Sequence, residues 1–237
     1  MEKKSSYTYK YPHPSVTTDC VIFGFDGKDL NILLVERGLE PFKGSWALPG
    51  GFLKMDETVE ECAKRELMEE TNVSNVFLEQ FHTFSAVDRD PRERVITVAF
   101  YALVKPSDYE VIGGEDAAQA EWFNQNELPP LAFDHEDVIN MAKDCLKEKL
   151  RTKPIAFKLL NDKFSMTELQ TLYEVILDTK YDRRNFYRKA LSSGFLSEEG
   201  VSEKVRASRR PNLYSFDEKL FEGSEDSQPT GKFPFDF

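Results

Sequence analysis

Residues 51–73, GFLKMDETVEECAKRELMEETNV, decide the fold predicted for this chain. A helix opening at Glu57, with 3.6 residues per turn, brings Glu66, Glu69 and Glu70 into one arc, because residues three and four apart share a face. That arc overlaps the side of the helix whose small and apolar residues look into the protein. The other charged side chains are predicted to form a solvated stripe: Glu57, Glu60, Glu61 and Lys64.

Carboxylates turned toward a protein body are costly, because they lose solvation and repel one another at a spacing of four residues. A hard divalent cation with oxygen ligands removes both costs, and Mg²⁺ bound together with phosphate is the usual case. A plain acidic surface helix is the alternative. The preceding WALPGG, residues 46–51, favours the cation site, because a Pro-Gly-Gly turn lets the backbone approach a ligand. Glu57 suits the start of a helix, and Arg65 offers a counter-charge on the buried side.

With these residues in place, the stretch resembles the box of the Nudix family, G-x5-E-x7-R-E-U-x-E-E-x-G-U, in which U is aliphatic. The fixed positions that match are Gly51, Glu57, Arg65, Glu66, Leu67, Glu69, Glu70 and Val73. Asn72 stands where the family has glycine, and Asn is the next most tolerant residue of left-handed backbone at a helix end. The resemblance implies an α/β (α+β) fold, an α/β/α sandwich with a mixed sheet, and Mg²⁺ or Mn²⁺ as cofactor.

The same resemblance implies roles for individual residues. The predicted metal ligands are Gly51, Glu66, Glu69 and Glu70. The predicted catalytic set is Glu66, Glu69, Glu70, Arg65 and Glu57. Substrate or effector contacts are predicted at Arg37, Gly50, Gly51, Arg89, Arg92 and Glu115. Two of these arginines lie in AVDRDPR, residues 86–92, which resembles the DRDPR stretch beside the substrate of ADP-ribose pyrophosphatases, although a plain surface loop is the alternative.

Composition and charge place the chain in a broad class. At 237 residues, 40% hydrophobic and 31% charged, it reads as a soluble globular protein with room for two modest domains. The start has no apolar signal region, and no membrane-length apolar run occurs, so a cytoplasmic protein without membrane contact is expected. The net charge is −11, yet residues 151–215 carry 13 Lys and Arg against 8 Asp and Glu, which predicts two bodies with different partners. The predicted divisions are a polar lead over 1–14, a Nudix domain over 15–151, a linker over 151–154, a winged helix-turn-helix over 155–220 and a flexible tail over 222–237.

Local patterns predict the elements of the first domain. Strands are expected over 16–25 and 30–35, joined as a hairpin by DGKD, and over 76–84 and 95–104. A further strand is expected around Trp122. Asp134 is predicted to cap a helix that ends near Leu150.

The second domain begins with SMTE, residues 165–168, a capping box directly before apolar residues at helical spacing. Asp182 is predicted to cap a second helix, RRNFYRKALSS, that Gly194 ends. Its inward side chains are predicted to be Phe186, Ala190 and Leu191. Two short strands then flank a polar segment with arginines. Helix, turn, basic helix and a two-stranded flap form the layout of a winged helix-turn-helix, although a basic helix is also consistent with an ordinary solvated face.

The domain pair, with FSMTELQTLYEVIL, YDRRNFYRKAL and RRPNLYSF, resembles Nudix-related transcriptional regulators of the NrtR and AraR type. The resemblance implies operator DNA and a sugar or ADP-ribose-like nucleotide effector as partners. A homodimer is expected, because helix-turn-helix proteins read paired half-sites. The predicted DNA contacts are Arg183, Arg184, Asn185, Arg188, Lys189, Arg209 and Arg210. All box glutamates are kept, so Mg²⁺-dependent hydrolysis is a further expectation; a Nudix hydrolase of ADP-ribose or another nucleoside diphosphate derivative, with an accessory C-terminal domain, is the alternative.

Overall fold

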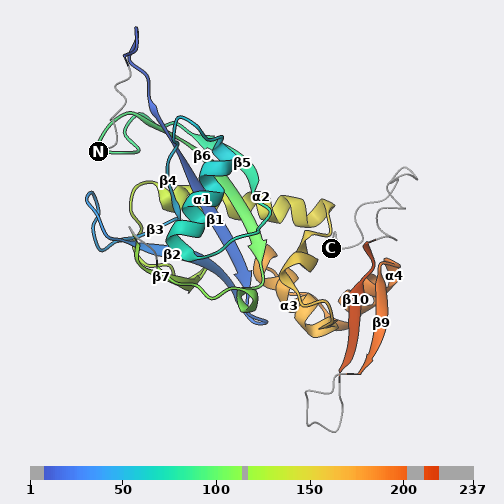
Figure 1. The fold of residues 1–237 in the computed structure, drawn as a ribbon. Coiled ribbons are helices and arrows are strands. Elements are labelled where there is room, and N and C mark those ends of the chain that lie inside the picture. Colours follow the sequence, from blue (N-terminus) through green and yellow to red (C-terminus); the bar gives the residue numbers. More distant parts are fainter. Residues whose placement is uncertain (1–7, 114–116, 202–210, 219–237) are drawn as a thin grey trace.

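The computed structural model describes residues 8–113, 117–201 and 211–218. Within them, one mixed seven-stranded sheet has the order β3-β2-β1-β6-β5, with β4 paired to β1 and β7 to β2 (Figure 1). Its strands are β1 (Ser15–Phe25), β2 (Leu30–Arg37), β3 (Trp46–Ala47), β4 (Gly50–Phe52), β5 (Glu79–Phe84), β6 (Val95–Val104) and β7 (Ala117–Asn124). The predicted hairpin of β1 and β2 is confirmed, whereas β5 begins three residues later than the predicted start at Val76.

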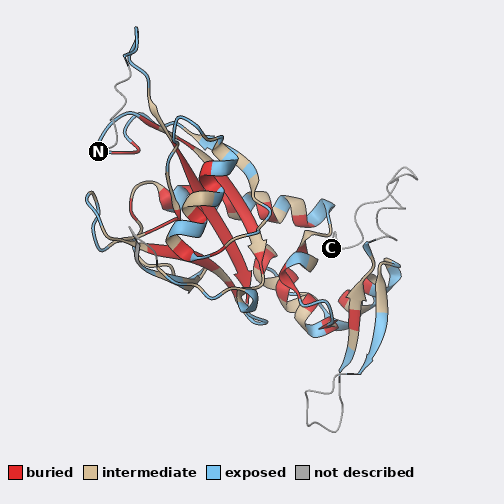
Figure 2. Ribbon diagram, viewed as in Figure 1, coloured by how far each residue is buried: buried red, intermediate tan, exposed pale blue. Residues whose placement is uncertain are grey.

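The sheet is built around β1, which pairs in parallel with β6 and antiparallel with β2. Successive side chains of a strand point to opposite faces. Cys20 and Ile22 therefore pack with α1 (Val59–Thr71) on one face, and Val21 and Phe23 pack with α2 (His135–Thr152) on the other. Figure 1 shows the two helices on opposite faces, and Figure 2 shows how strongly β1 and β6 are buried between them. The predicted α/β/α sandwich is confirmed.

The box helix starts later than predicted. Thr58 is its N-cap and accepts a hydrogen bond from the Glu61 amide, while the Glu61 carboxylate accepts one from the Thr58 amide. This capping box starts the helix at Val59, so Glu57 lies ahead of it. At the other end Asn72 has φ of 60° and ψ of 15°, the left-handed conformation expected at the family's glycine position.

The winged helix-turn-helix follows as predicted. Its elements are η2 (Ile155–Leu159), β8 (Phe164–Ser165), α3 (Met166–Leu177), α4 (Arg183–Ser192), β9 (Leu196–Val201) and β10 (Asn212–Phe216). The predicted capping box of Ser165 and Glu168 is present, and the Asp182 side chain caps α4. Phe186 and Ala190 are buried, but Leu191, predicted to face inward, is exposed.

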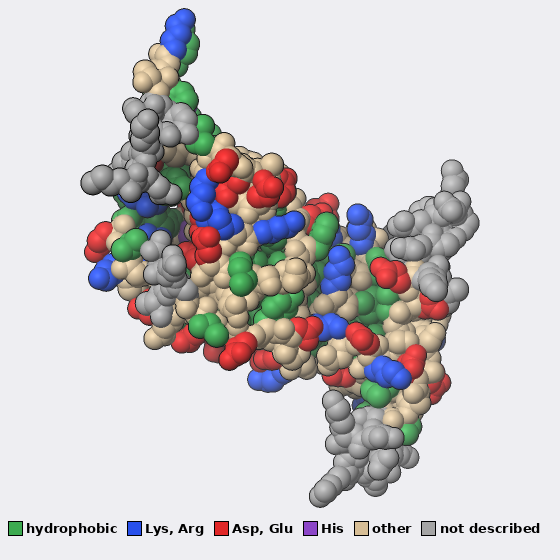
Figure 3. All heavy atoms as spheres, viewed as in Figure 1, with side chains coloured by type: hydrophobic (Ala, Val, Ile, Leu, Met, Phe, Trp, Pro, Cys, Tyr) green, Lys and Arg blue, Asp and Glu red, His purple; other side chains and the backbone are tan. Residues whose placement is uncertain are grey.

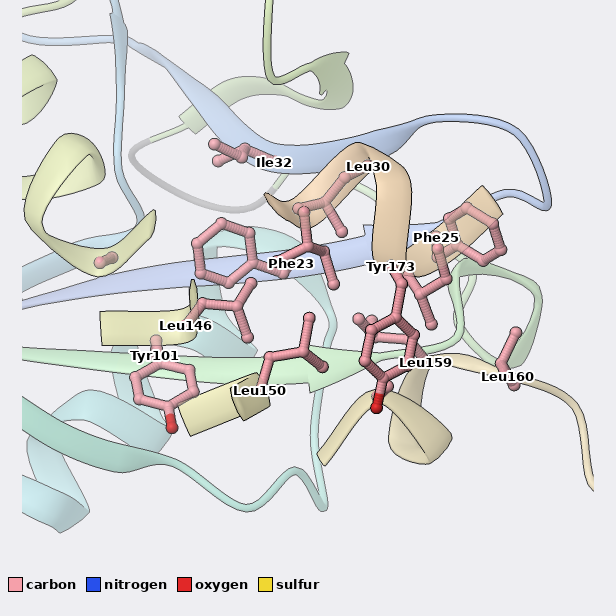
Figure 4. Packing of buried hydrophobic residues seen from close by; sticks show 14 of the residues in the cluster. Phe23, Phe25, Leu30, Ile32, Tyr101, Leu146, Leu150, Leu159, Leu160 and Tyr173 are labelled. Carbon is pink, nitrogen blue, oxygen red and sulfur yellow. The ribbon is translucent and has the colours of Figure 1, made fainter. Parts of the chain in front are cut away.

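The two domains share a core where a linker was predicted. Helix α2 runs to Thr152 and η2 begins at Ile155, which leaves little of the expected linker over 151–154. One cluster of buried side chains runs from Phe23 of the sheet through Leu150 of α2 to Tyr173 of α3 (Figure 4). The winged helix therefore packs directly against the end of the first domain. In the described part of the chain, no helix is both long and apolar enough to span a bilayer.

Candidate functional site

A cavity of about 530 Å³ lies beside the box helix. Its size is within the range of small-molecule sites. Its walls come from β1, β2, β4, α1, the loop over 86–92 and the start of α2. The predicted site residues that line it are Arg37, Gly50, Gly51, Arg65, Glu66, Glu69, Glu70, Arg89 and Arg92. These predicted site residues come from four separated stretches of sequence, which the fold brings to one place.

The two glycines let the box carboxylates approach the backbone. A Cβ added to Gly50 would lie 2.0 Å from the Thr18 carbonyl oxygen, and one added to Gly51 would lie 2.4 Å from Glu66 Oε1. The Gly50 amide donates to Glu70 Oε2 at 2.9 Å. The backbone at the two glycines therefore closely approaches strand β1 and helix α1, and its approach to a ligand stays a prediction.

Arg65 holds three carboxylates at once. It donates to both oxygens of Glu57, at 2.6 and 2.8 Å, to Glu66 at 2.6 Å and to Glu69 at 3.1 Å. Hydrogen bonds from Arg65 lower the pKa of Glu57 to about 2. Glu57 was predicted to lie in a solvated stripe, and this was wrong, because it precedes the helix and its side chain is 11% exposed. The predicted role of Arg65 as a counter-charge to the box carboxylates is confirmed.

The acidic end of the cavity suits a hard cation by donor type. Glu66, Glu69 and Glu70 line the cavity together with Gly51, and their oxygen atoms are the ligands that Mg²⁺ prefers. Burial raises the pKa of Glu66 despite its hydrogen bond from Arg65, a cost that a bound cation relieves. Among the described residues no three His, Cys, Asp or Glu side chains are assembled as a metal cage. The predicted ligand set therefore shares one cavity, with its carboxylates bonded to Arg65 and the Gly50 amide.

Two guanidinium groups meet at another part of the same cavity. Those of Arg37 and Arg92 lie 4.8 and 5.5 Å from the ring centre of Phe133. Arg92 pairs with Asp90 at 2.7 Å. In the described part of the chain, Arg37 donates to the carbonyl oxygens of Pro41 and Leu39 instead. Burial, with the nearby charge of Arg92, lowers the pKa of Arg37. An anion would compensate this local excess of positive charge.

Arg89, predicted as an effector contact, is buried and forms ion pairs with two aspartates of the protein itself. Its side chain is 4% exposed and donates to Asp134 at 2.6 and 2.9 Å and to Asp19 at 3.1 Å. Asp134 occupies the N-cap position of α2 as predicted, but its carboxylate binds Arg89 and makes no capping bond. Beside it, His135 Nδ1 accepts the Leu48 amide at 2.8 Å, and burial lowers the pKa of this imidazole.

Several lining residues have no signal in the sequence. Thr17, Asp19, Phe52, Phe133 and His135 line the cavity, yet none of them occupies a fixed position of a sequence motif. Pairing of strands distant in sequence brings them together. Three predicted site residues, Glu115, Arg209 and Arg210, lie outside the described residues, as does the tail over 222–237.

The second helix of the winged domain presents its basic residues to solvent. Arg183, Arg184, Asn185 and Arg188 are exposed, and Lys189 is partly buried. Two arginines in the first turn of α4 oppose the helix dipole, so local helix stability does not account for them. Over the face seen in Figure 3, acidic and basic side chains are interspersed, as expected for a chain with charges of both signs in each domain.

Comparison with known proteins identifies both the domain that contains the cavity and the winged domain. The NUDIX domain family matches residues 13–142, and the NrtR DNA-binding winged helix domain matches residues 156–216. The chain is 36% identical over 210 residues to the ADPR responsive transcriptional repressor NtrR of Acinetobacter baylyi, covering 87% of this chain and 83% of that protein. It is 42% identical over 150 residues to the ADP-ribose pyrophosphatase of Methanocaldococcus jannaschii, covering 63% and 83%.

A solved structure, NrtR of Shewanella oneidensis, has the same arrangement of domains. It matches with a TM-score of 0.71 at 31% identity, covering 85% of this chain and 93% of that one. The same protein complexed with a 27mer DNA matches at a TM-score of 0.69, 30% identity and coverages of 85% and 93%. Its NUDIX domain complexed with ADP ribose matches at 0.54, 34% identity and coverages of 59% and 94%. The chain therefore belongs to the Nudix family, among the Nudix-related transcriptional regulators whose second domain is the NrtR winged helix.

Proposed function

We propose that this chain is a DNA-binding transcriptional regulator whose first domain senses ADP-ribose. One observation carries the choice of effector: a single cavity contains box carboxylates and, with them, the guanidinium groups of Arg37 and Arg92. A diphosphate flanked by two sugars matches that distribution of charge, since arginine favours phosphate and the carboxylates favour phosphate-bound cations. A neutral sugar, the other effector predicted, would leave Arg37 without an anion.

The residues of the cavity have distinct tasks in this proposal. Arg37 and Arg92 bind the diphosphate, and the ring of Phe133 between them offers an aromatic face to the ligand. Glu66, Glu69, Glu70 and the Gly51 carbonyl would hold Mg²⁺ or Mn²⁺. A cation bound there supplies charge neutralisation at the diphosphate and, in a hydrolytic cycle, a water of lowered pKa.

Helix α2 offers a physical connection from the cavity to the winged domain. At its start, His135 lines the cavity and Asp134 pairs with Arg89, which also lines it. Near its end, Leu146 and Leu150 lie in the core that includes Leu159 and Tyr173 of the second domain. A ligand that moves the loop over 86–92 therefore acts on α2 through Arg89. The result at the far end is a shift in the position of the winged helix.

On the DNA side, the exposed residues at the start of α4 are the proposed base and phosphate contacts. Arginine reads guanine through paired hydrogen bonds, and the N-terminal part of a recognition helix lies nearest to the bases. A homodimer would place two such helices on paired half-sites about one helical turn apart. The DNA complex of the Shewanella oneidensis relative supports this part of the proposal.

Hydrolysis of ADP-ribose is the second candidate function, and the retained box glutamates favour it. The experiment combines both. Full-length protein is titrated with ADP-ribose and with arabinose, with and without Mg²⁺, and the melting temperature and product are followed. Binding of ADP-ribose alone supports the sensor; Mg²⁺-dependent turnover that Glu70→Gln abolishes adds the enzyme. No shift with ADP-ribose and a shift with arabinose would reject the proposed effector.

A further inference from the structure

A second cavity, of about 570 Å³, lies at the junction of the two domains. Its lining includes Gln125 and Asn126, which follow β7, then Lys143 and Lys147 on α2. The rest of the lining comes from the end of α3 and the loop after it, within residues 174–180. It shares no lining residue with the effector cavity, so the function proposed above makes no use of it.

Two lysines of this cavity, both partly buried, form no ion pair within the described part of the chain, although Glu136 in the first turn of α2 lies near enough to Lys143 to raise its pKa. Lys143 and Lys147 are four residues apart on α2, a spacing at which like charges repel. The Lys143 ammonium donates to the Gln125 carbonyl oxygen at 2.9 Å. Among the ion pairs of the described residues neither lysine takes part. Burial, together with Lys147, lowers the pKa of Lys143, in agreement with this geometry.

One of the two acidic groups that line the cavity is already engaged with other partners. Glu174 accepts from Lys180 at 2.8 Å, from the Tyr181 amide at 3.1 Å and from the Gln170 side chain at 2.8 Å. Its charge is therefore balanced by the third lysine of the cavity. The remaining carboxylate is that of Asp178, whose backbone ends α3 in the left-handed conformation.

We propose that this junction binds a phosphate-bearing anion between Lys143 and Lys147 of the first domain and the end of α3 of the second. The Gln125 side chain already donates to the Val175 carbonyl oxygen across the junction at 2.9 Å, so the two walls are held at a fixed spacing. An anion bound here contacts both domains and stabilises the observed arrangement of the winged helix. The phosphate can belong to a free small molecule or to the DNA backbone, and the free molecule is the source proposed.

The test uses full-length protein, inorganic pyrophosphate as the probe and calorimetric titration in the absence of DNA. The Arg37→Ala variant weakens binding in the effector cavity, and the junction double substitution Lys143→Gln with Lys147→Gln is then added to it. The expected result is pyrophosphate binding to Arg37→Ala that weakens at least about tenfold in the combined variant, as loss of charged hydrogen bonds predicts. The matched control is Lys64→Gln, on the exposed side of α1, which leaves binding unchanged.

Removing two repelling ammonium groups is expected to leave the melting temperature equal or higher, and the single change Lys147→Gln serves as a second, milder variant. Equal pyrophosphate affinity with and without the junction lysines overturns the proposal, as does no binding to Arg37→Ala. A second arm measures DNA affinity with no pyrophosphate present. If the junction variant alone weakens DNA binding, the lysines contact the DNA backbone and the proposal is also overturned. Affinity for ADP-ribose, measured in parallel without the Arg37 substitution, reports separately on the function proposed above.

Discussion

The Arg89 guanidinium donates to both carboxylate oxygens of Asp134, Nη2 to Oδ1 at 2.6 Å and Nε to Oδ2 at 2.9 Å. This pair connects the loop over 86–92, beside the effector cavity, to the N-cap of α2. Since the other end of α2 packs into the core shared with the winged helix, the pair connects the effector cavity to that core through α2. Arg89, predicted as an effector contact, lines the cavity and also binds Asp134, whereas Asp134, predicted to cap α2, makes no capping bond and binds Arg89 instead.

Replacement of Arg89 tests how much this ion-pair network contributes to the stability of the fold. Arg89→Ala leaves the buried carboxylate of Asp19 and that of Asp134 without their cation, and breaking a buried ion pair typically costs about 3 kcal/mol or more. Urea unfolding of the two proteins measures the difference in unfolding free energy. Lys43→Ala, at an exposed position, is the control and should change stability by less than about 0.5 kcal/mol. A change of that small size for Arg89→Ala would show that the network does not stabilise the fold.

The box helix shows which structural features could be predicted from the sequence. The side of this helix that faces the protein, with its inward glutamates, follows from local residue spacing. So do its left-handed end at Asn72 and the caps of α3 and α4. The start at Val59 was missed because Glu57 matches the box regardless of whether it is helical. The shared core was missed for another reason: whether Phe23 and Tyr173 touch depends on packing between segments far apart in sequence. The same limit hid the Arg89 network and the aromatic part of the cavity.

The pair of Arg65 and Glu57 predicts a pH dependence of stability. Hydrogen bonds from Arg65 lower the pKa of Glu57 from 4.5 to about 2 in the folded protein. The unfolded chain therefore binds the proton first, so this contribution is complete above pH 4.5 and is lost as the pH falls from about 4.5 toward 2. Unfolding free energy measured from pH 7 to 3 should fall less steeply in Glu57→Gln than in the unsubstituted protein. Identical slopes would contradict the assignment, and Glu60→Gln on the exposed side of α1 is the matched control.

Arg37 predicts the affinity for a diphosphate effector. Charge-assisted hydrogen bonds contribute about 1.5–3 kcal/mol, so Arg37→Ala should weaken ADP-ribose binding by at least about tenfold. Calorimetric titration gives the affinity, and Arg151→Ala, exposed on α2, is the matched arginine control. Affinity for ribose, which has no phosphate, should not depend on Arg37. If both variants bind ADP-ribose as well as the unsubstituted protein does, the diphosphate lies elsewhere.

The arginines at the start of α4 predict the salt dependence of DNA binding. Each phosphate contact contributes about 0.9 to the slope of log affinity against log salt. Removing Arg183 and Arg184 together should lower that slope by up to about 2 if both contact phosphate. Fluorescence anisotropy over a salt series measures it, with Lys28→Ala and Lys43→Ala combined as a control of equal charge. A slope that matches the control would remove α4 from the DNA interface.

The central claim is that ADP-ribose in the first cavity changes the affinity of the winged helix for DNA. The direct measurement is the dissociation constant for an operator, selected from a random DNA pool, with and without saturating ADP-ribose. A coupling of about 1–3 kcal/mol predicts a change of roughly 5- to 150-fold, and Arg37→Ala should abolish it at the same effector concentration. An operator affinity of the unsubstituted protein that stays the same while calorimetry shows the cavity filled would contradict the account.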